Sequence, residues 1–402
     1  MQEIIKTAAG AERLLIRART IITMQAEKPV LDNGALLVTR QVDGLRLAAV
    51  GTWAELGSET APVIDLGEAT LAPGLINAHT HLEISHLKGK TTGGNGFVAW
   101  LKSLVPHLNQ EPETESWSAA LAEMRGCGTV FAADMADRHA DRLAPFLERE
   151  QCAHWLMVQQ FGFADRPHTR KGKLWPPPTM AERKNPKIAD RKNFCRAGHA
   201  FYSTAPDTLQ AAKTWDHERQ RPFALHLAEH VGETELLQTG RGELADFFRT
   251  AGILPDDFRP PGLSPTAYAE KLGLLDDSTL AVHCVHLDDR DIAILARHRV
   301  NVCLCPRSNA FIGVGKAPYE RLARAGLNLC LGTDSLTSNS DLDLWKELDF
   351  LLEQSGFTML DALAMVTINP ARALKIDPDY GSLESGKKAC WSIVPDSFNL
   401  KP

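Results

Sequence analysis

The architecture of this chain follows from one stretch, Leu71-Ala72-Pro73-Gly74-Leu75-Ile76-Asn77-Ala78-His79-Thr80-His81-Leu82-Glu83. Its small and apolar residues predict a buried strand, and the strand ends in two histidines. Because side chains alternate between the faces of a strand, His79 and His81 point to the same side. Two imidazoles there can supply half of a metal site. On these two residues alone, ordinary core histidines are an equally open interpretation.

The bulk properties are those of a globular protein and exclude several classes. A chain of 402 residues predicts two or three domains. The net charge of −6 gives no reason to expect nucleic acid or an anionic membrane as a partner. The start, Met1–Lys6, lacks the pattern of a signal peptide, and no apolar run is long enough to span a bilayer. Eight cysteines in a chain this long do not indicate a disulfide scaffold, so we expect reduced thiols and a cytoplasmic protein.

Both ends of the chain predict β structure. From Leu14 to Leu66, short apolar runs alternate with turn signals such as Asp32-Asn33-Gly34. A last apolar strand, Cys390–Val394, needs a sheet to join. We therefore expect residues 1–68 and 371–402 to form one small β-sandwich domain.

Between these ends, strands alternate with helices such as Phe97–Leu108 and Ser116–Gly126, the second with Ser116 as its N-cap. Counting from Leu71, the pattern gives eight strands, which predicts an α/β fold with a closed (β/α)8 barrel over residues 69–370. The seven later strands are expected at Thr129–Ala133, His154–Phe161, Ala200–Thr204, Pro222–Leu227, Thr279–His283, Val300–Cys305 and Leu327–Gly332.

A basic segment, residues 162–198, interrupts this alternation. It carries ten Lys and Arg against Asp165, Glu182 and Asp190. A loop this long is either functional or mobile. It is thus either a solvated, partly disordered excursion or a lid that offers a cation to an anionic substrate.

Reactive side chains follow several of the predicted strands. Barrel enzymes place catalytic groups at the carboxyl ends of their strands. His226 and Glu229 follow the fifth strand, His283 the sixth and Asp334 the eighth. An aspartate directly after a buried strand is costly unless it is paired or bound to a metal. Together with the two histidines of the first strand, this pattern predicts a metal site.

These motifs resemble the amidohydrolase superfamily, in particular its deaminase and chlorohydrolase branch. The resemblance covers nearly the whole chain and implies a (β/α)8 barrel with a β-sandwich built from both termini. It rests on His79-x-His81, His226-x-x-Glu229, His283-x-x-His286, Gly332-Thr333-Asp334, Pro73–Asn77, Cys305–Asn309, Asn369–Ala371 and Gly381–Leu383.

The resemblance implies a set of metal ligands, namely His79, His81, His226 and Asp334. Three neutral imidazoles and a carboxylate suit Zn²⁺, or alternatively Fe²⁺, and leave a position open for a water whose pKa the metal lowers. No lysine in His154–Phe161 could be carboxylated to bridge two ions, which favours one metal.

The same resemblance implies catalytic roles for three residues. Glu229 is the proton shuttle, His283 orients the water or the substrate, and Asp334 also serves as a base. In a continuing strand Glu229 would face away from His226. We therefore expect the strand to break near Ala228.

The implied reaction is hydrolytic deamination of an aminated purine nucleoside. The segments His81–Ser85 and Gly96-Phe97-x-x-Trp100 resemble the aminofutalosine deaminases of the alternative menaquinone pathway, so 6-aminodeoxyfutalosine or a related adenosine derivative is the expected substrate. The expected substrate contacts are Glu83, Ser85, Phe97 and Trp100. Phe97 or Trp100 could stack on the substrate, or could equally be core residues at i, i+3 spacing.

Other functions stay open at this point. They are a guanine- or cytosine-type deaminase, a pterin deaminase, a chlorohydrolase on the same frame, and a non-enzymatic scaffold. The sequence does not decide whether the protein forms a homo-oligomer.

Overall fold

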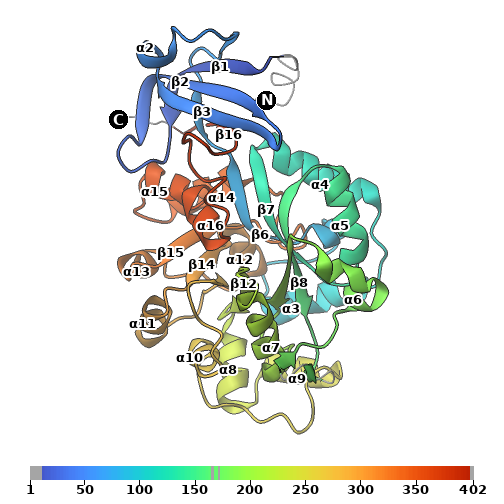
Figure 1. The fold of residues 1–402 in the computed structure, drawn as a ribbon. Coiled ribbons are helices and arrows are strands. Elements are labelled where there is room, and N and C mark those ends of the chain that lie inside the picture. The colour runs from blue at the N-terminus through green and yellow to red at the C-terminus, as the bar shows by residue number, and fades with distance from the viewer. Residues whose placement is uncertain (1–10, 164–166, 171–172, 399–402) are drawn as a thin grey trace.

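The computed structural model describes residues 11–163, 167–170 and 173–398. It contains a β-sheet built from both ends of the chain, and this sheet lies beside a barrel surrounded by helices (Figure 1). The predicted architecture is therefore present.

The terminal sheet has six strands in the order β16-β5-β1-β2-β3, with β4 also paired to β1. β16 runs antiparallel to β5, with Trp391 opposite Pro73, which confirms that the last strand joins the N-terminal sheet. Side chains of β1 alternate, so that Ile16 packs with Trp391 while Leu15 packs with Leu37 on the other face. The strands are β1 (Arg13–Ile22), β2 (Val30–Gln41), β3 (Gly44–Thr52), β4 (Val63–Asp65), β5 (Thr70–Pro73) and β16 (Trp391–Ile393).

The single strand predicted to start at Leu71 is two strands in the structure. β5 ends at Pro73 and belongs to the terminal sheet, whereas the first barrel strand starts at Leu75. Gly74 lies between them, and a Cβ atom there would lie 2.5 Å from the side chain of Val130. The glycine thus allows the chain to pass closely from one sheet to the other.

The barrel consists of two parallel four-stranded sheets, β11-β8-β7-β6 and β12-β13-β14-β15. Its strands are β6 (Leu75–Thr80), β7 (Thr129–Ala136), β8 (Ala153–Gln160), β11 (Phe194–Gly198), β12 (Phe223–Leu227), β13 (Thr279–His283), β14 (Asn301–Leu304) and β15 (Asn328–Leu331). One seam is bridged where the His226 amide donates to the His199 carbonyl at 3.0 Å. At the other, the Asp334 amide donates to the His79 carbonyl, also at 3.0 Å. Predicted metal ligands therefore lie at both seams.

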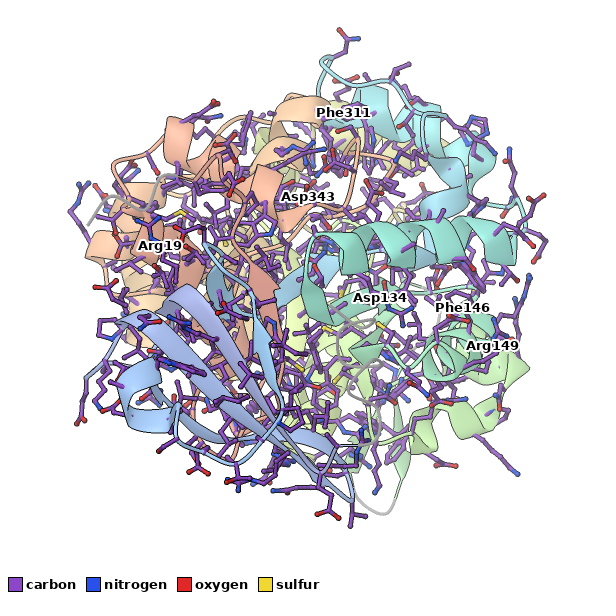
Figure 2. The ribbon with its side chains drawn as sticks, turned by 90° about the horizontal axis from the view of Figure 1, so that it is seen from above. Arg19, Asp134, Phe146, Arg149, Phe311 and Asp343 are labelled. Atoms are coloured by element: carbon purple, nitrogen blue, oxygen red, sulfur yellow. The ribbon has the colours of Figure 1, made fainter. Side chains whose placement is uncertain are left out.

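Helices cover the outside of the barrel (Figure 1). Asp134 of β7 lies toward the centre of the molecule, whereas Arg149 lies at its margin (Figure 2). The α-helices are α2 (Trp53–Leu56), α3 (Phe97–Leu104), α4 (Thr114–Gly126), α5 (Ala140–Arg149), α6 (Met180–Lys184), α7 (Pro206–His217), α8 (Val231–Thr239), α9 (Glu243–Thr250), α10 (Pro265–Lys271), α11 (Asp289–Arg297), α12 (Pro306–Ile312), α13 (Tyr319–Arg324), α14 (Leu344–Glu353), α15 (Met359–Ala364) and α16 (Ile368–Ala373). The 3₁₀ turns are η1 (Leu82–Leu87), η2 (Val105–His107) and η3 (Pro186–Asp190), and a small hairpin joins β9 (His168–Arg170) to β10 (Lys173–Trp175).

The sequence predicted Ser116 as the N-cap of a barrel helix, and this prediction is wrong. α4 begins at Thr114, and its N-cap is Glu113. The Ser116 hydroxyl instead donates to the Glu113 carbonyl at 2.7 Å, inside the first turn.

The predicted fourth barrel strand is also wrong. The strand is Phe194–Gly198, and residues 200–204 form a turn after it. Arg196 breaks the apolar pattern of this strand, yet it is only 1% exposed because its guanidinium donates to both carboxylate oxygens of Glu182, at 2.9 and 2.5 Å.

The basic segment therefore carries a barrel strand. The interpretation as a solvated loop is wrong for residues 180–198, which form α6, η3 and β11. Three charged residues of the basic segment lie outside the described residues, namely Asp165, Arg166 and Lys171.

Two further features concern the whole described chain. All eight cysteines lie in it, and none forms a disulfide. Within the same ranges, the structure has no helix with the length and apolar character needed to cross a membrane.

Candidate metal centre

Two histidines at the carboxyl end of β6 form the first part of the site. The Nε2 atoms of His79 and His81 lie 3.1 Å apart. Burial lowers the pKa of His81 to about 4 and that of His79 well below its usual value, so both rings are neutral near pH 7. Two neutral ring nitrogens this close are suited to share a cation.

His226 comes from the end of β12, across the barrel. Its ring centroid lies 5.0 Å from that of His79 and 5.7 Å from that of His81. Its Nδ1 lies 3.0 Å from the His199 carbonyl, which can only accept, so Nδ1 carries the proton and Nε2 has a free lone pair. The candidate ligand nitrogens of these histidines all lie within 4.8 Å of one another.

Asp334 follows β15 and completes the cluster. Its Oδ1 atom lies 3.5 Å from His79 Nε2 and 3.3 Å from His81 Nε2. Its Oδ2 atom accepts hydrogen bonds from the hydroxyls of Ser308, at 2.6 Å, and Ser338, at 2.9 Å. The carboxylate thus presents one oxygen to the histidines and has the other fixed by hydroxyl groups.

Burial alone would raise the pKa of Asp334. The hydrogen bond with His79 and the neighbouring imidazoles outweigh this effect and hold the pKa well below its usual range. Asp334 is therefore ionised.

These four groups fit a single divalent cation. Three neutral imidazoles and one ionised carboxylate form the donor set of a zinc site with an open position, and the same set accepts Fe²⁺. In the described part of the chain, His79 Nδ1 is buried without a hydrogen-bond partner. The strands β8 and β11 contain no lysine for a bridging carbamate, which agrees with one ion.

Glu229 reaches the site through the expected break in the strand. β12 ends at Leu227, and Ala228 adopts a left-handed conformation with φ of 52°. Glu229 Oε1 then lies 3.7 Å from His283 Nε2. Burial, with the charges of Asp334 and Glu233 adding to it, raises the pKa of Glu229 well above its usual value, although Tyr202 partly opposes the shift. Glu229 is therefore able to carry a proton near pH 7.

His283 lies between Glu229 and the ligand cluster. Its ring stacks on His226 with a centroid distance of 5.4 Å. Its Nδ1 atom lies 3.0 Å from Asn309 Oδ1, and this contact fixes the plane of the imidazole. Nε2 is left facing Glu229.

The sequence analysis missed His199, Tyr202 and Glu233. His199 follows β11, and its ring centroid lies 5.0 Å from that of His226. Glu233 is fully buried, and its Oε2 atom accepts the Glu229 amide at 3.2 Å. Correct placement of the fourth strand would have shown that His199 follows the end of a barrel strand. A histidine at such a position indicates a candidate catalytic or metal-binding residue. Tyr202 and Glu233 carry no comparable signal in the sequence.

The predicted substrate contacts already have protein partners. Phe97 is 6% exposed and stacks on His230 with a centroid distance of 4.0 Å. Trp100 donates its indole N–H to the Thr337 carbonyl at 3.0 Å.

The other two predicted contacts lie just beyond His81. The carboxylate of Glu83 accepts the amides of Asp137, at 2.5 Å, and Arg138, at 2.9 Å. Ser85 is buried, and no described group bonds its hydroxyl. A substrate contact for any of the four stays a prediction.

Comparison with known proteins gives a family match. The model of the amidohydrolase family matches residues 70–402. A 5-methylthioadenosine/S-adenosylhomocysteine deaminase from Moorella thermoacetica is 32% identical, and the alignment covers 95% of this chain and 85% of the relative. A deaminase of the same name from Halalkalibacterium halodurans is 29% identical over 96% of this chain and 86% of its own.

Solved structures share the fold. An adenosine deaminase from Xanthomonas campestris with bound zinc superposes with a TM-score of 0.76 at 24% identity, covering 95% of this chain and 84% of the other. Helicobacter pylori aminofutalosine deaminase in complex with methylthio-coformycin gives 0.79 at 20% identity, with 94% and 91% covered. An atrazine chlorohydrolase from Arthrobacter aurescens with zinc gives 0.76 at 18% identity, with 94% and 86% covered.

Proposed function

This chain belongs to the amidohydrolase family, and we propose that it is a metal-dependent hydrolytic deaminase of an adenosine derivative. One observation supports the proposal: at the carboxyl ends of β6, β12 and β15, the four candidate metal ligands and the buried carboxyl of Glu229 lie together, with His283 of β13 beside them. The relatives named above as deaminases of adenosine derivatives support the substrate class. Within it, 6-aminodeoxyfutalosine is the substrate that we favour.

Four side chains would hold the cation: His79, His81, His226 and Asp334. When bound, the metal supplies an activated water for attack on the ring carbon that carries the amino group. Zn²⁺ is the ion that this donor set favours, with Fe²⁺ as the alternative.

Proton transfer falls to Glu229 and Asp334. Glu229 accepts a proton from the attacking water and delivers it to the neighbouring ring nitrogen. Asp334 assists the second proton transfer, to the departing amine. A carbon–oxygen bond forms, the carbon–nitrogen bond breaks, and the products are the 6-oxopurine nucleoside and ammonia.

His283 orients the reacting groups. Its ring is fixed by Asn309 on one side and by stacking on His226 on the other. Such fixation keeps the imidazole edge in place while Glu229 moves its proton.

The test is a substrate panel. The zinc-loaded protein is given adenosine, S-adenosylhomocysteine, 5′-methylthioadenosine and 6-aminodeoxyfutalosine, with guanine, cytosine, an aminated pterin and a chlorinated triazine as the competing classes. Ammonia release, chloride release and the loss of adenine absorbance are followed, and metal-stripped protein is the control. We expect ammonia from adenosine derivatives and none from the control. Turnover confined to the competing classes would contradict the proposal.

A further inference from the structure

An aromatic ring that the proposed mechanism does not use lies beside the metal ligands. Phe161 directly follows β8 and is 41% exposed. Its ring centroid is 4.3 Å from that of His199, and the His199 ring is in turn 5.0 Å from that of His226. From the buried metal ligand to solvent, the order is therefore His226, His199, Phe161. We call the last two rings the Phe161–His199 wall.

One short segment, residues 203–205, contacts both the His199 ring and the backbone next to Phe161. The Ser203 hydroxyl lies 2.5 Å from His199 Nδ1. The Ser203 carbonyl accepts the Gly162 amide at 2.7 Å, and the Gly162 carbonyl accepts the amide of residue 205 at 3.0 Å. The backbone next to Phe161 is thus fixed in the same frame as the His199 ring.

Gly162 lies between two phenylalanines that differ in solvent exposure. Its φ of 96° lies in the left-handed region, which glycine adopts without strain. Beyond it, Phe163 is 9% exposed and packs in a core cluster, whereas Phe161 stays at the surface.

The other aromatic candidates are already engaged. Phe97 stacks on His230, and the indole N–H of Trp100 is bonded to the Thr337 carbonyl. Phe161 offers an open ring face, and the adjacent His199 ring extends it. The wall therefore presents mainly aromatic surface.

We infer that the Phe161–His199 wall binds an apolar or aromatic substituent at the 5′ end of the nucleoside. The inference rests on the proposed function and specifies the substrate class further. The base must occupy the space beside His226 and Glu229, where its reacting carbon meets the attacking water. Phe161 is separated from His226 by the His199 ring. We therefore expect Phe161 to contact the part of the nucleoside beyond the base.

The chemistry of the wall separates two kinds of nucleoside. A thioether or an aryl group gains from contact with the phenyl face. A free 5′-hydroxyl gains nothing there and loses contact with water. We therefore expect the enzyme to prefer 5′-methylthioadenosine to adenosine, and this preference to depend on Phe161.

The test compares these two substrates in the zinc-loaded full chain and its variants. Phe161→Ala removes the ring, and Phe161→Tyr keeps it. Leu360→Ala is the matched control, because Leu360 is 39% exposed and lies on α15, outside the site. Metal content is measured for each variant, and kcat and KM are determined separately.

We expect Phe161→Ala to lower kcat/KM for 5′-methylthioadenosine about tenfold, mainly through KM, because one apolar contact is worth about that factor. The value for adenosine should change less than about twofold, and Phe161→Tyr and Leu360→Ala should keep the preference. An equal loss for both substrates, or no loss for either, would overturn the inference while leaving deamination by the wild type intact. If the wild type deaminates no adenosine derivative of the panel, the proposed function itself fails, and the inference with it. Turnover of another adenosine derivative without turnover of 5′-methylthioadenosine would overturn the inference alone.

Discussion

A buried ammonium group at the amino end of the barrel has protein partners that several buried atoms at the carboxyl end lack. At the amino end, the Lys213 ammonium donates to Asp276 at 2.6 Å and to the hydroxyls of Ser278 and Thr279 at 2.8 Å each. At the carboxyl end, polar atoms are buried without partners among the described residues, for example His79 Nδ1, Asn309 Nδ2 and Glu233 Oε1. The Lys213 ammonium is therefore satisfied by protein groups, whereas these atoms of the candidate site are left able to bind a ligand.

The pKa values show the same contrast. Burial would raise the pKa of Asp276, but the hydrogen bond and charge of Lys213 hold it at about 2. Among the described residues, Glu229 has no lysine or arginine beside it, and burial raises its pKa well above the usual value. One carboxyl is locked in its charged form, and the other is able to exchange a proton near pH 7.

The largest expected effect comes from the carboxyl end. Glu229→Gln keeps the shape of the side chain but removes the exchangeable proton. We expect kcat to fall about 10²–10⁴-fold, the range for loss of a general acid–base. Steady-state kinetics on the best adenosine derivative measures the change.

Metal content serves as the control for this variant. Glu229 is not among the four ligands, so the variant should bind the same amount of zinc per chain as the wild type. Activity within about tenfold of the wild type would remove Glu229 from the proton transfer.

A substitution at the amino end of the barrel should lower the free energy of unfolding and leave kcat unchanged. Lys213→Met keeps the length of the side chain and leaves Asp276 without its cation. Breaking a fully buried pair costs ~3–5 kcal/mol, and because the Asp276 side chain is 34% exposed we expect a lower cost, about 2–3 kcal/mol. Urea unfolding measures the loss, and kcat per folded, zinc-loaded molecule should stay within about twofold of the wild type. A large loss of kcat in the folded variant would contradict the division between the two ends.

Glu233 gives an effect on stability that depends on pH. Burial raises its pKa to about 8, although the amides of Glu229 and Ala228 oppose the shift. Below its unfolded pKa of about 4.5 the group is protonated in both states and costs nothing. As the pH rises from there to about 8, only the unfolded state releases the proton, so stability falls by ~1.4 kcal/mol per pH unit.

Glu233→Gln tests this dependence. The amide cannot titrate, so the variant should lose less stability than the wild type between pH 5 and about 8, and the difference should grow with pH. Urea unfolding at pH 5, 6, 7 and 8 gives the comparison. Parallel pH profiles for the two proteins would show that Glu233 is ionised in the folded state.

The carboxyl ends of β6, β12, β13 and β15 could be predicted from the sequence, because these buried strands keep their apolar pattern. The break after Leu227 could also be predicted, since a continuing strand would have turned Glu229 away from the site. The fourth strand could not be placed, because Arg196 interrupts its pattern and becomes compatible with burial only through Glu182, a residue in another element. His199 was missed for the same reason.

The predicted substrate contacts show a second limit. Helical spacing predicts that Phe97 and Trp100 share a face of α3, but it does not say what covers that face. In the structure, His230 stacks on Phe97 and the Thr337 carbonyl binds the Trp100 indole. Both partners come from distant parts of the chain, and local patterns carry no information about them.

The central claim is that His79, His81, His226 and Asp334 bind one divalent cation. A crystal structure of the zinc-loaded protein, with anomalous data on both sides of the zinc absorption edge, tests it most directly. The account predicts one anomalous peak at the carboxyl end of the barrel, about 2.0–2.2 Å from a ligand atom of each of the four residues. No peak there, two peaks, or a peak that leaves out His226 or Asp334 would contradict it.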